Sequence, residues 1–230
     1  MTALERMIAS LNHEEPDRAA VWTLIDNSDL MRHFADGEDC DALMTDHTNS
    51  EDLLDLTART CEALGIDVTF LCYKYLMNPF PRDATDLQTI SEHKSEFQNV
   101  EDLKKYSPNV PTYEAIEAEL LPEFNRVKEA LEPHTVLVSQ GGCSIEACHG
   151  LGFELFSMAM YDAPGELGRI MDAYSEHQRI ICQVYADHKL APAYQVSCDI
   201  GFKGTLLFSP DYLRQEMIPR LKYEIEPIKN

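Results

Sequence analysis

The sequence has little positive charge and no long hydrophobic run. Its 230 residues include 40 acidic side chains against 19 lysines and arginines, which gives a formal net charge of -21. So negative a chain repels phosphate groups, and we expect neither a nucleic acid nor an anionic membrane as a partner. No apolar run approaches the roughly 18 residues that a membrane-spanning helix needs. The first 18 residues are typical of an amphipathic helix, not of a signal peptide, so we expect a cytoplasmic chain.

A disulfide framework is also missing. The seven cysteines are an odd number and are scattered along the chain, a pattern that favours reduced, buried thiols. A hydrophobic fraction of 44% with 26% charged residues is ordinary for a globular enzyme, and the length suits one large core. We therefore expect a single domain over residues 1–230 that acts on a small molecule.

Four short apolar runs rich in β-branched residues predict buried strands, over residues 18–25, 66–73, 134–140 and 193–200. Helical periodicity fills the intervals between the later runs. Its clearest segments are residues 50–65, which end at a glycine, 113–133 and 164–189. Alternating strands and helices imply a parallel sheet covered by helices, either doubly wound or closed into a barrel.

One long irregular segment, residues 76–112, interrupts this alternation. Long loops in compact domains are often functional, so we expect a short hairpin or a substrate lid there.

The stretch SQGGCSIEACHG, residues 139–150, concentrates reactive side chains directly after a predicted strand. Its cysteine spacing matches no local zinc motif, and it lacks the lysine of a phosphate-binding loop. What remains is a tight turn from strand to helix. Gly141 and Gly142 permit the turn, and Glu146 or His149 then faces the carboxyl end of the strands, where α/β proteins bind ligands. The alternative is that the histidine and both cysteines simply pack at the start of a helix.

Three segments carry a resemblance to a known family. MTALERMIASLNHEEPDRAAVW, with its P-D-R turn, QGGCSIEACHGLGFELFSMAMYDAPGELGRIMD and DIGFKGTLLFSPDYLRQEMIP are similar to segments of the uroporphyrinogen decarboxylase superfamily. The resemblance implies a (β/α)8 TIM barrel with its active site at the carboxyl ends of the strands. Family members continue beyond such a helix as the last one here, so we expect the chain to hold the N-terminal two-thirds of a barrel, truncated at its C-terminal end.

The superfamily has a decarboxylase branch and a corrinoid-dependent methyltransferase branch. The decarboxylase binds a tetrapyrrole polyanion through two arginines, whose positions fall at Ile25 and Asp29 in an ungapped count. Its aspartate, tyrosine and hydroxyl residue fall at Lys74, His149 and Ile200. These changes favour the methyltransferase branch.

Membership of the methyltransferase branch implies a corrinoid (cobalamin) as methyl carrier, a corrinoid protein as partner, and a small-molecule methyl donor or thiol acceptor. Thiol-using members also bind zinc, through a His-x-Cys pair and a distant Cys that we expect beyond residue 230; we assign no metal ligand within this chain. The expected catalytic residues are Glu146, His149 and Asp199, and the expected substrate-binding residues are Gly141, Gly142, Lys74 and Cys198.

Three other functions stay open. The chain could be a decarboxylase-like lyase of porphyrin biosynthesis, or a binding module for a methylated substrate or a corrinoid protein without turnover. It could also be another barrel hydrolase or lyase that uses Glu146 and His149 as an acid/base pair.

The missing arginines give a direct test. We expect the purified protein not to decarboxylate uroporphyrinogen, because Ile25 and Asp29 cannot pair with the carboxylates of that substrate. Chromatographic detection of the reaction products is the measurement, and any coproporphyrinogen formed above the no-enzyme control would refute the expectation.

Overall fold

The computed structural model describes residues 1–23, 25, 27–45, 50–70, 97–132, 134–144, 147–197 and 200–229. The chain divides into two compact units. The first unit comprises Met1–Lys74, Glu119–Gln140 and Leu190–Gln195, and the second comprises Tyr75–Ala118, Gly141–Lys189 and Val196–Asn230. Over the described part of the chain, no helix is both long and apolar enough to cross a membrane.

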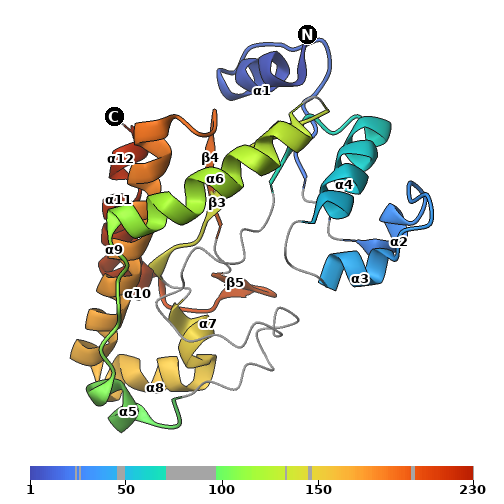
Figure 1. The fold of residues 1–230 in the computed structure, drawn as a ribbon. Helices are drawn as coiled ribbons and strands as arrows, with labels where there is room; N and C mark the ends of the chain where they lie inside the picture. The colour runs from blue at the N-terminus through green and yellow to red at the C-terminus, as the bar shows by residue number, and fades with distance from the viewer. Residues whose placement is uncertain are drawn as a thin grey trace. The chain divides into compact units, whose positions relative to one another are not determined.

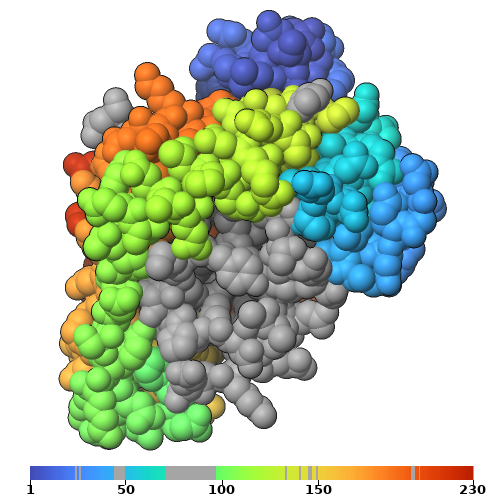
Figure 2. All heavy atoms as spheres, viewed as in Figure 1, coloured from blue at the N-terminus to red at the C-terminus, as the bar shows by residue number. Residues whose placement is uncertain are grey.

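The first unit combines short strands with helices. Its elements are α1 (Ala3–Leu11), α2 (Ser28–Met31), α3 (Cys40–Thr45), α4 (Glu51–Leu64), β1 (Val68–Thr69), most of α6 (Tyr113–Leu131) and β2 (Val136–Leu137). The C-terminal glycine predicted for α4 is confirmed, because Gly65 adopts the left-handed conformation with φ of 65° and its N–H bonds back to the helix. The surface of α1 is seen in dark blue in Figure 2.

Parallel pairing joins the predicted strand regions. β1 pairs with β2 in the register Val68 to Val136, and Trp22 forms a parallel bridge to Val68 on the other side. The first three predicted strand regions are therefore parallel neighbours in chain order. Within the described residues, β1 and β2 are each two residues long, which is shorter than the predicted runs.

A second pair joins β3 (Ser139–Gly141) to β4 (Tyr194–Val196). The Ser139 N–H donates to Ala193 O at 3.4 Å and the Ser197 N–H donates to Gly141 O at 3.0 Å. Residue numbers rise together along both segments, as in a parallel pair. Within the described residues the sheets are two-stranded, so barrel closure stays a prediction.

A buried ion network fixes the start of β1. Asp67, which is 2% exposed, accepts hydrogen bonds from Arg6 at 2.5 Å, from Arg18 at 2.6 and 2.9 Å, and from the Val21 N–H at 2.9 Å. Arg6 also makes a two-point pair with Asp17, at 2.7 and 2.9 Å. Burial alone would raise the pKa of Asp67, but the Val21 amide and the two arginines outweigh it and hold the pKa below its ordinary value.

Two clusters of buried apolar side chains lie in the first unit. One cluster joins Met7 of α1 to residues of the two strands and their flanks, Val68, Phe70, Val136 and Val138. A second cluster packs α2, α3 and α4 together through Ile25, Met31, Cys40, Leu56, Cys61 and Ile66. The helices of the first unit thus bury apolar side chains of the strands and of the segments beside them.

The second unit is mostly helical. Its elements are α5 (Val100–Lys105), α7 (Ala147–Leu151), α8 (Phe153–Asp162), α9 (Pro164–His188), β5 (Gly201–Phe202), β6 (Thr205–Leu206), α10 (Pro210–Tyr212), η2 (Leu213–Met217), α11 (Ile218–Glu224) and α12 (Glu226–Lys229). α11 and α12 pack along α9, as Figure 1 shows. β5 and β6 form an antiparallel hairpin that was not predicted from the sequence, and its turn contains Gly204 with φ of 84°.

The C-terminal helix begins at a serine cap and is irregular just before Pro219. Ser209 caps α10 by accepting the Tyr212 N–H at 3.2 Å, and Pro210 occupies the first turn. The π-helical stretch η2 then precedes Pro219, which has no N–H for the preceding turn. Tyr212 lies against Phe208 with ring centroids 5.8 Å apart and an interplanar angle of 34°, and it packs against the core of the second unit.

The long segment 76–112 contains one helix that the sequence analysis did not predict. α5 is capped by Asn99, whose side chain accepts the Glu101 N–H at 2.9 Å. Residues 76–96, which make up most of the segment where a hairpin or lid is predicted, lie outside the described residues.

The Asp67 network predicts a large loss of stability on charge removal. Asp67→Asn leaves two arginines facing a neutral amide, and breaking a buried pair in this way costs about 3 kcal/mol in the free energy of unfolding, measured by urea denaturation. The control is Asp29→Asn, since the Asp29 side chain is 87% exposed and the change should cost no more than about 0.5 kcal/mol. Equal losses in the two variants would contradict the prediction.

The pH dependence of this difference has a defined sign. Because the folded pKa of Asp67 is lowered, its contribution is present above the unfolded pKa of about 4 and is lost as pH falls through the folded value. The stability gap between wild type and Asp67→Asn should therefore be constant at neutral pH and shrink in acid.

His177 predicts a second pH effect. It lies on α9 with 1% exposure, has no hydrogen-bond partner among the described residues, and burial lowers its pKa to about 4. The unfolded chain takes up a proton at about pH 6.5, whereas the folded chain does so only at about pH 4. The free energy of unfolding should therefore fall by about 1.4 kcal/mol for each unit by which the pH is lowered between these two values. His177→Leu should remove this slope in urea titrations, whereas the same change at the exposed His33 serves as control.

Candidate functional site

The candidate site lies at the carboxyl ends of β3 and β4. Because the two strands are parallel, their carboxyl ends share one edge, the place where α/β folds bind ligands. The hydrogen bond from the Ser197 N–H to Gly141 O, at 3.0 Å, brings the turn after β3 beside the segment after β4. Two of the segments selected from the sequence therefore meet through their backbones.

The structure describes only some of the predicted site residues. Gly141 and Gly142 are half-buried; Gly141 is the last residue of β3 and Gly142 follows it. The backbone of His149 belongs to α7. The side chain of that histidine and four whole residues lie outside the described residues: Lys74, Glu146, Cys198 and Asp199. Their roles stay predictions.

Both cysteines of the stretch 139–150 are packed. Cys143 and Cys148 are 0% and 5% exposed and belong to the core cluster of the second unit, beside Ala147 and Leu151. The packing alternative is therefore correct for these two thiols. Val196 and Ile200, on either side of the end of β4, pack against the same cluster, which gives the site an apolar wall.

A buried carboxylate missed by the sequence analysis holds the turn. Glu224 of α11 is 1% exposed, and its Oε1 accepts the Ser144 N–H at 3.1 Å and the Ser175 hydroxyl at 2.8 Å. Ser175 belongs to α9, so one oxygen joins the turn to two helices. A signal was present in the sequence: Glu224 continues the apolar stripe that Met217 and Leu221 form on the core face.

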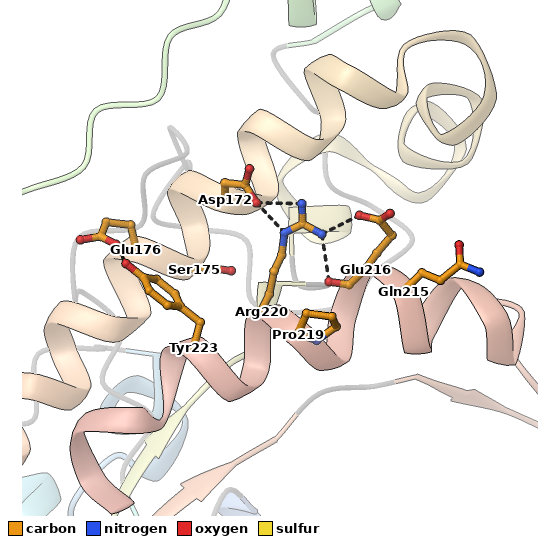
Figure 3. Close-up of a pocket in the computed structure, with 8 residues that line it drawn as sticks. All are labelled: Asp172, Ser175, Glu176, Gln215, Glu216, Pro219, Arg220 and Tyr223. Atoms are coloured by element: carbon orange, nitrogen blue, oxygen red, sulfur yellow. Dashed lines mark hydrogen bonds and ion pairs between the residues drawn. The ribbon is translucent and has the colours of Figure 1, made fainter. Parts of the chain in front are cut away.

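A pocket of about 470 Å³ opens between α9 and the C-terminal helices. Figure 3 shows Arg220 held between two carboxylates and Tyr223 turned toward Glu176. Arg220 bonds to Asp172 at 2.7 and 2.8 Å and to Glu216 at 2.7 Å. Burial alone would lower the pKa of Arg220, but these two carboxylates raise it above its ordinary value. The charge of Arg220 is therefore already paired with Asp172 and Glu216. The pocket is thus polar and acidic, a poor match for an anionic substrate.

Ile25 and Asp29, the two positions compared with the decarboxylase arginines, lie in the core and on the surface of the first unit. Ile25 is 8% exposed and packs against the core of the first unit, beside Met31 and Leu56. Asp29 is exposed and pairs with Arg32. Neither side chain can receive a carboxylate of a polyanion.

Metal ligands do not gather in the part of the chain that is described. No group of three or more His, Cys, Asp or Glu side chains there is placed to hold a metal ion. Burial raises the pKa of the Cys61 thiol to about 11, which makes it a poor ligand and a poor nucleophile.

Comparisons with known proteins show a likeness in fold. No family model matches the chain, and no curated protein matches its sequence. Among solved structures, a methyltransferase from Methanosarcina mazei superposes with a TM-score of 0.68 at 16% identity, over 100% of this chain and 68% of that one. The chain is therefore similar in fold, over all of its 230 residues, to a methyltransferase.

Proposed function

We propose that the chain is a methyltransferase that moves a methyl group between a corrinoid, free or on a corrinoid protein, and a small-molecule donor or thiol. The observation that carries the proposal is the likeness in fold to a methyltransferase along the whole chain. The same likeness and the parallel pairs support a (β/α)8 barrel as the architecture to which β1 to β4 belong.

The described residues near the turn suit this chemistry in one respect. Methyl transfer needs a cavity from which water is excluded, and the turn after β3 borders an apolar cluster that contains Cys143 and against which Val196 and Ile200 pack. A corrinoid, when bound, supplies a cobalt-bound methyl group. The described residues do not fit a zinc ion, so we derive no step through zinc.

In this proposal the chain's own groups bind and orient the small molecule. Gly141 and Gly142 leave room at the end of β3, and the polar groups of Glu146, His149 and Asp199 orient the methyl donor or acceptor. Of the two proposed substrate contacts, Lys74 directly follows the second predicted strand and Cys198 lies near the end of the fourth.

Methyl transfer can be tested with methylcobalamin and a panel of small thiols. We expect the wild-type protein to transfer the methyl group from cobalt to sulfur as the thiol loses its proton, detected by the visible spectrum of the cobalamin and by mass spectrometry of the thioether. In the reverse direction, methylated donors and reduced cobalamin are the substrates. Failure in both directions with all donors and thiols would count against the proposal.

Substitution at Glu146 tests the site within the same assay. Glu146→Gln keeps the shape and removes the charge, and losing one charged hydrogen bond should slow methyl transfer about 10- to 100-fold. His149→Ala should slow it less. The control is Glu154→Gln on α8, an exposed glutamate. If the Glu146 and His149 variants melt at lower temperature but transfer methyl at the wild-type rate, both residues are structural and the site assignment is wrong.

A further inference from the structure

The turn after β3 is held by a carboxylate that lies 80 residues further along the chain. Glu224 Oε1 accepts the Ser144 N–H at 3.1 Å, and the same oxygen accepts the Ser175 hydroxyl at 2.8 Å. Both bonds are buried, and Ser144 is 0% exposed. One oxygen therefore receives a backbone donor from the turn and a side-chain donor from α9.

Packing alone does not account for a glutamate at this position. On the core face of the C-terminal helix, the preceding positions are Leu213, Met217 and Leu221, which all join the apolar core. A charged carboxylate there loses its hydration, and such a group is retained in folded proteins only when donors compensate it. A leucine would fill the same stripe without that cost, but it could not accept the Ser144 N–H.

The donor at the turn is the backbone N–H of Ser144, which can only donate and so requires an acceptor such as Glu224 Oε1. The Ser144 amide lies three residues after Gly141 and three before the start of α7, so its direction constrains the path of the turn between them. The acceptor is itself fixed by Ser175, a residue in the middle of the long helix α9. The turn is thus anchored to two helices at one atom.

We propose that Glu224 is a positioning residue for the candidate site. It sets the course of the Gly141–Ser144 turn at the end of β3, where we have proposed that the methyl donor or acceptor binds. The consequence for catalysis rests on the proposed methyltransferase function, whereas the anchoring of the turn does not.

Hydrogen exchange measures the anchoring without any assay of activity. In Glu224→Ala, peptides that cover residues 141–151 should exchange at least about tenfold faster, because the Ser144 amide loses its acceptor. Glu224→Gln keeps an oxygen that can accept both bonds and should restore slow exchange. Glu226→Ala removes a glutamate from the neighbouring helix α12, where it pairs with Arg179, and should leave these peptides unchanged.

The methyl-transfer assay then separates a positioning role from general destabilisation. We expect Glu224→Ala to lower kcat about tenfold with little change in KM, and Glu224→Gln to recover most of the rate. If Glu224→Ala does not fold, Ser175→Ala replaces it, since this change removes one of the two bonds and should give the same effects in smaller measure.

The outcomes distinguish the two proposals. If hydrogen exchange in residues 141–151 is unchanged in Glu224→Ala, the positioning role is overturned, whatever the rates of methyl transfer. The same holds for Ser175→Ala where that variant replaces Glu224→Ala. Faster exchange without methyl transfer by the wild-type protein would uphold the anchoring and count against the proposed function. Faster exchange with an unchanged kcat would show that the turn is anchored but does not govern the reaction, which also overturns the positioning role.

Discussion

The folding of the first unit depends on a single buried carboxylate. Asp67 stands at the amino end of β1 and collects donors from α1, from the Pro-Asp-Arg turn and from the Val21 backbone. Without these donors its charge could not be buried, and without the charge the three segments would lose their common partner. Because the network lies at the opposite end of β1 from the carboxyl edge, it stabilises the unit and leaves the ligand-binding edge to other residues.

The sequence predicted the positions of the elements better than their extent. Helix α4 and its Gly65 cap follow from the apolar period and the glycine, and Ser209 follows from the capping preference. The strands are shorter than the apolar runs because an apolar side chain can be buried by packing without joining a ladder. The hairpin of β5 and β6 lacked the period-two pattern of a half-buried strand, since Thr205 and Leu206 are both exposed.

The candidate site was predictable in its local part only. The turn at Gly141 follows from a glycine pair after an apolar run, and its meeting with Ser197 follows from parallel pairing. Glu224 did not follow, because its partners are 80 and 49 residues away and only the folded chain brings them together. A carboxylate on an apolar helix stripe is the sequence signal that such distant donors exist.

Trp22 gives the protein a built-in optical probe. It is the only tryptophan in the sequence, and it forms the parallel bridge to Val68 at the edge of the first unit. Tryptophan emission therefore reports the state of the first unit alone, while the circular dichroism of the helices reports both units. A denaturation curve recorded by the two methods shows directly whether the units unfold as one cooperative system or separately.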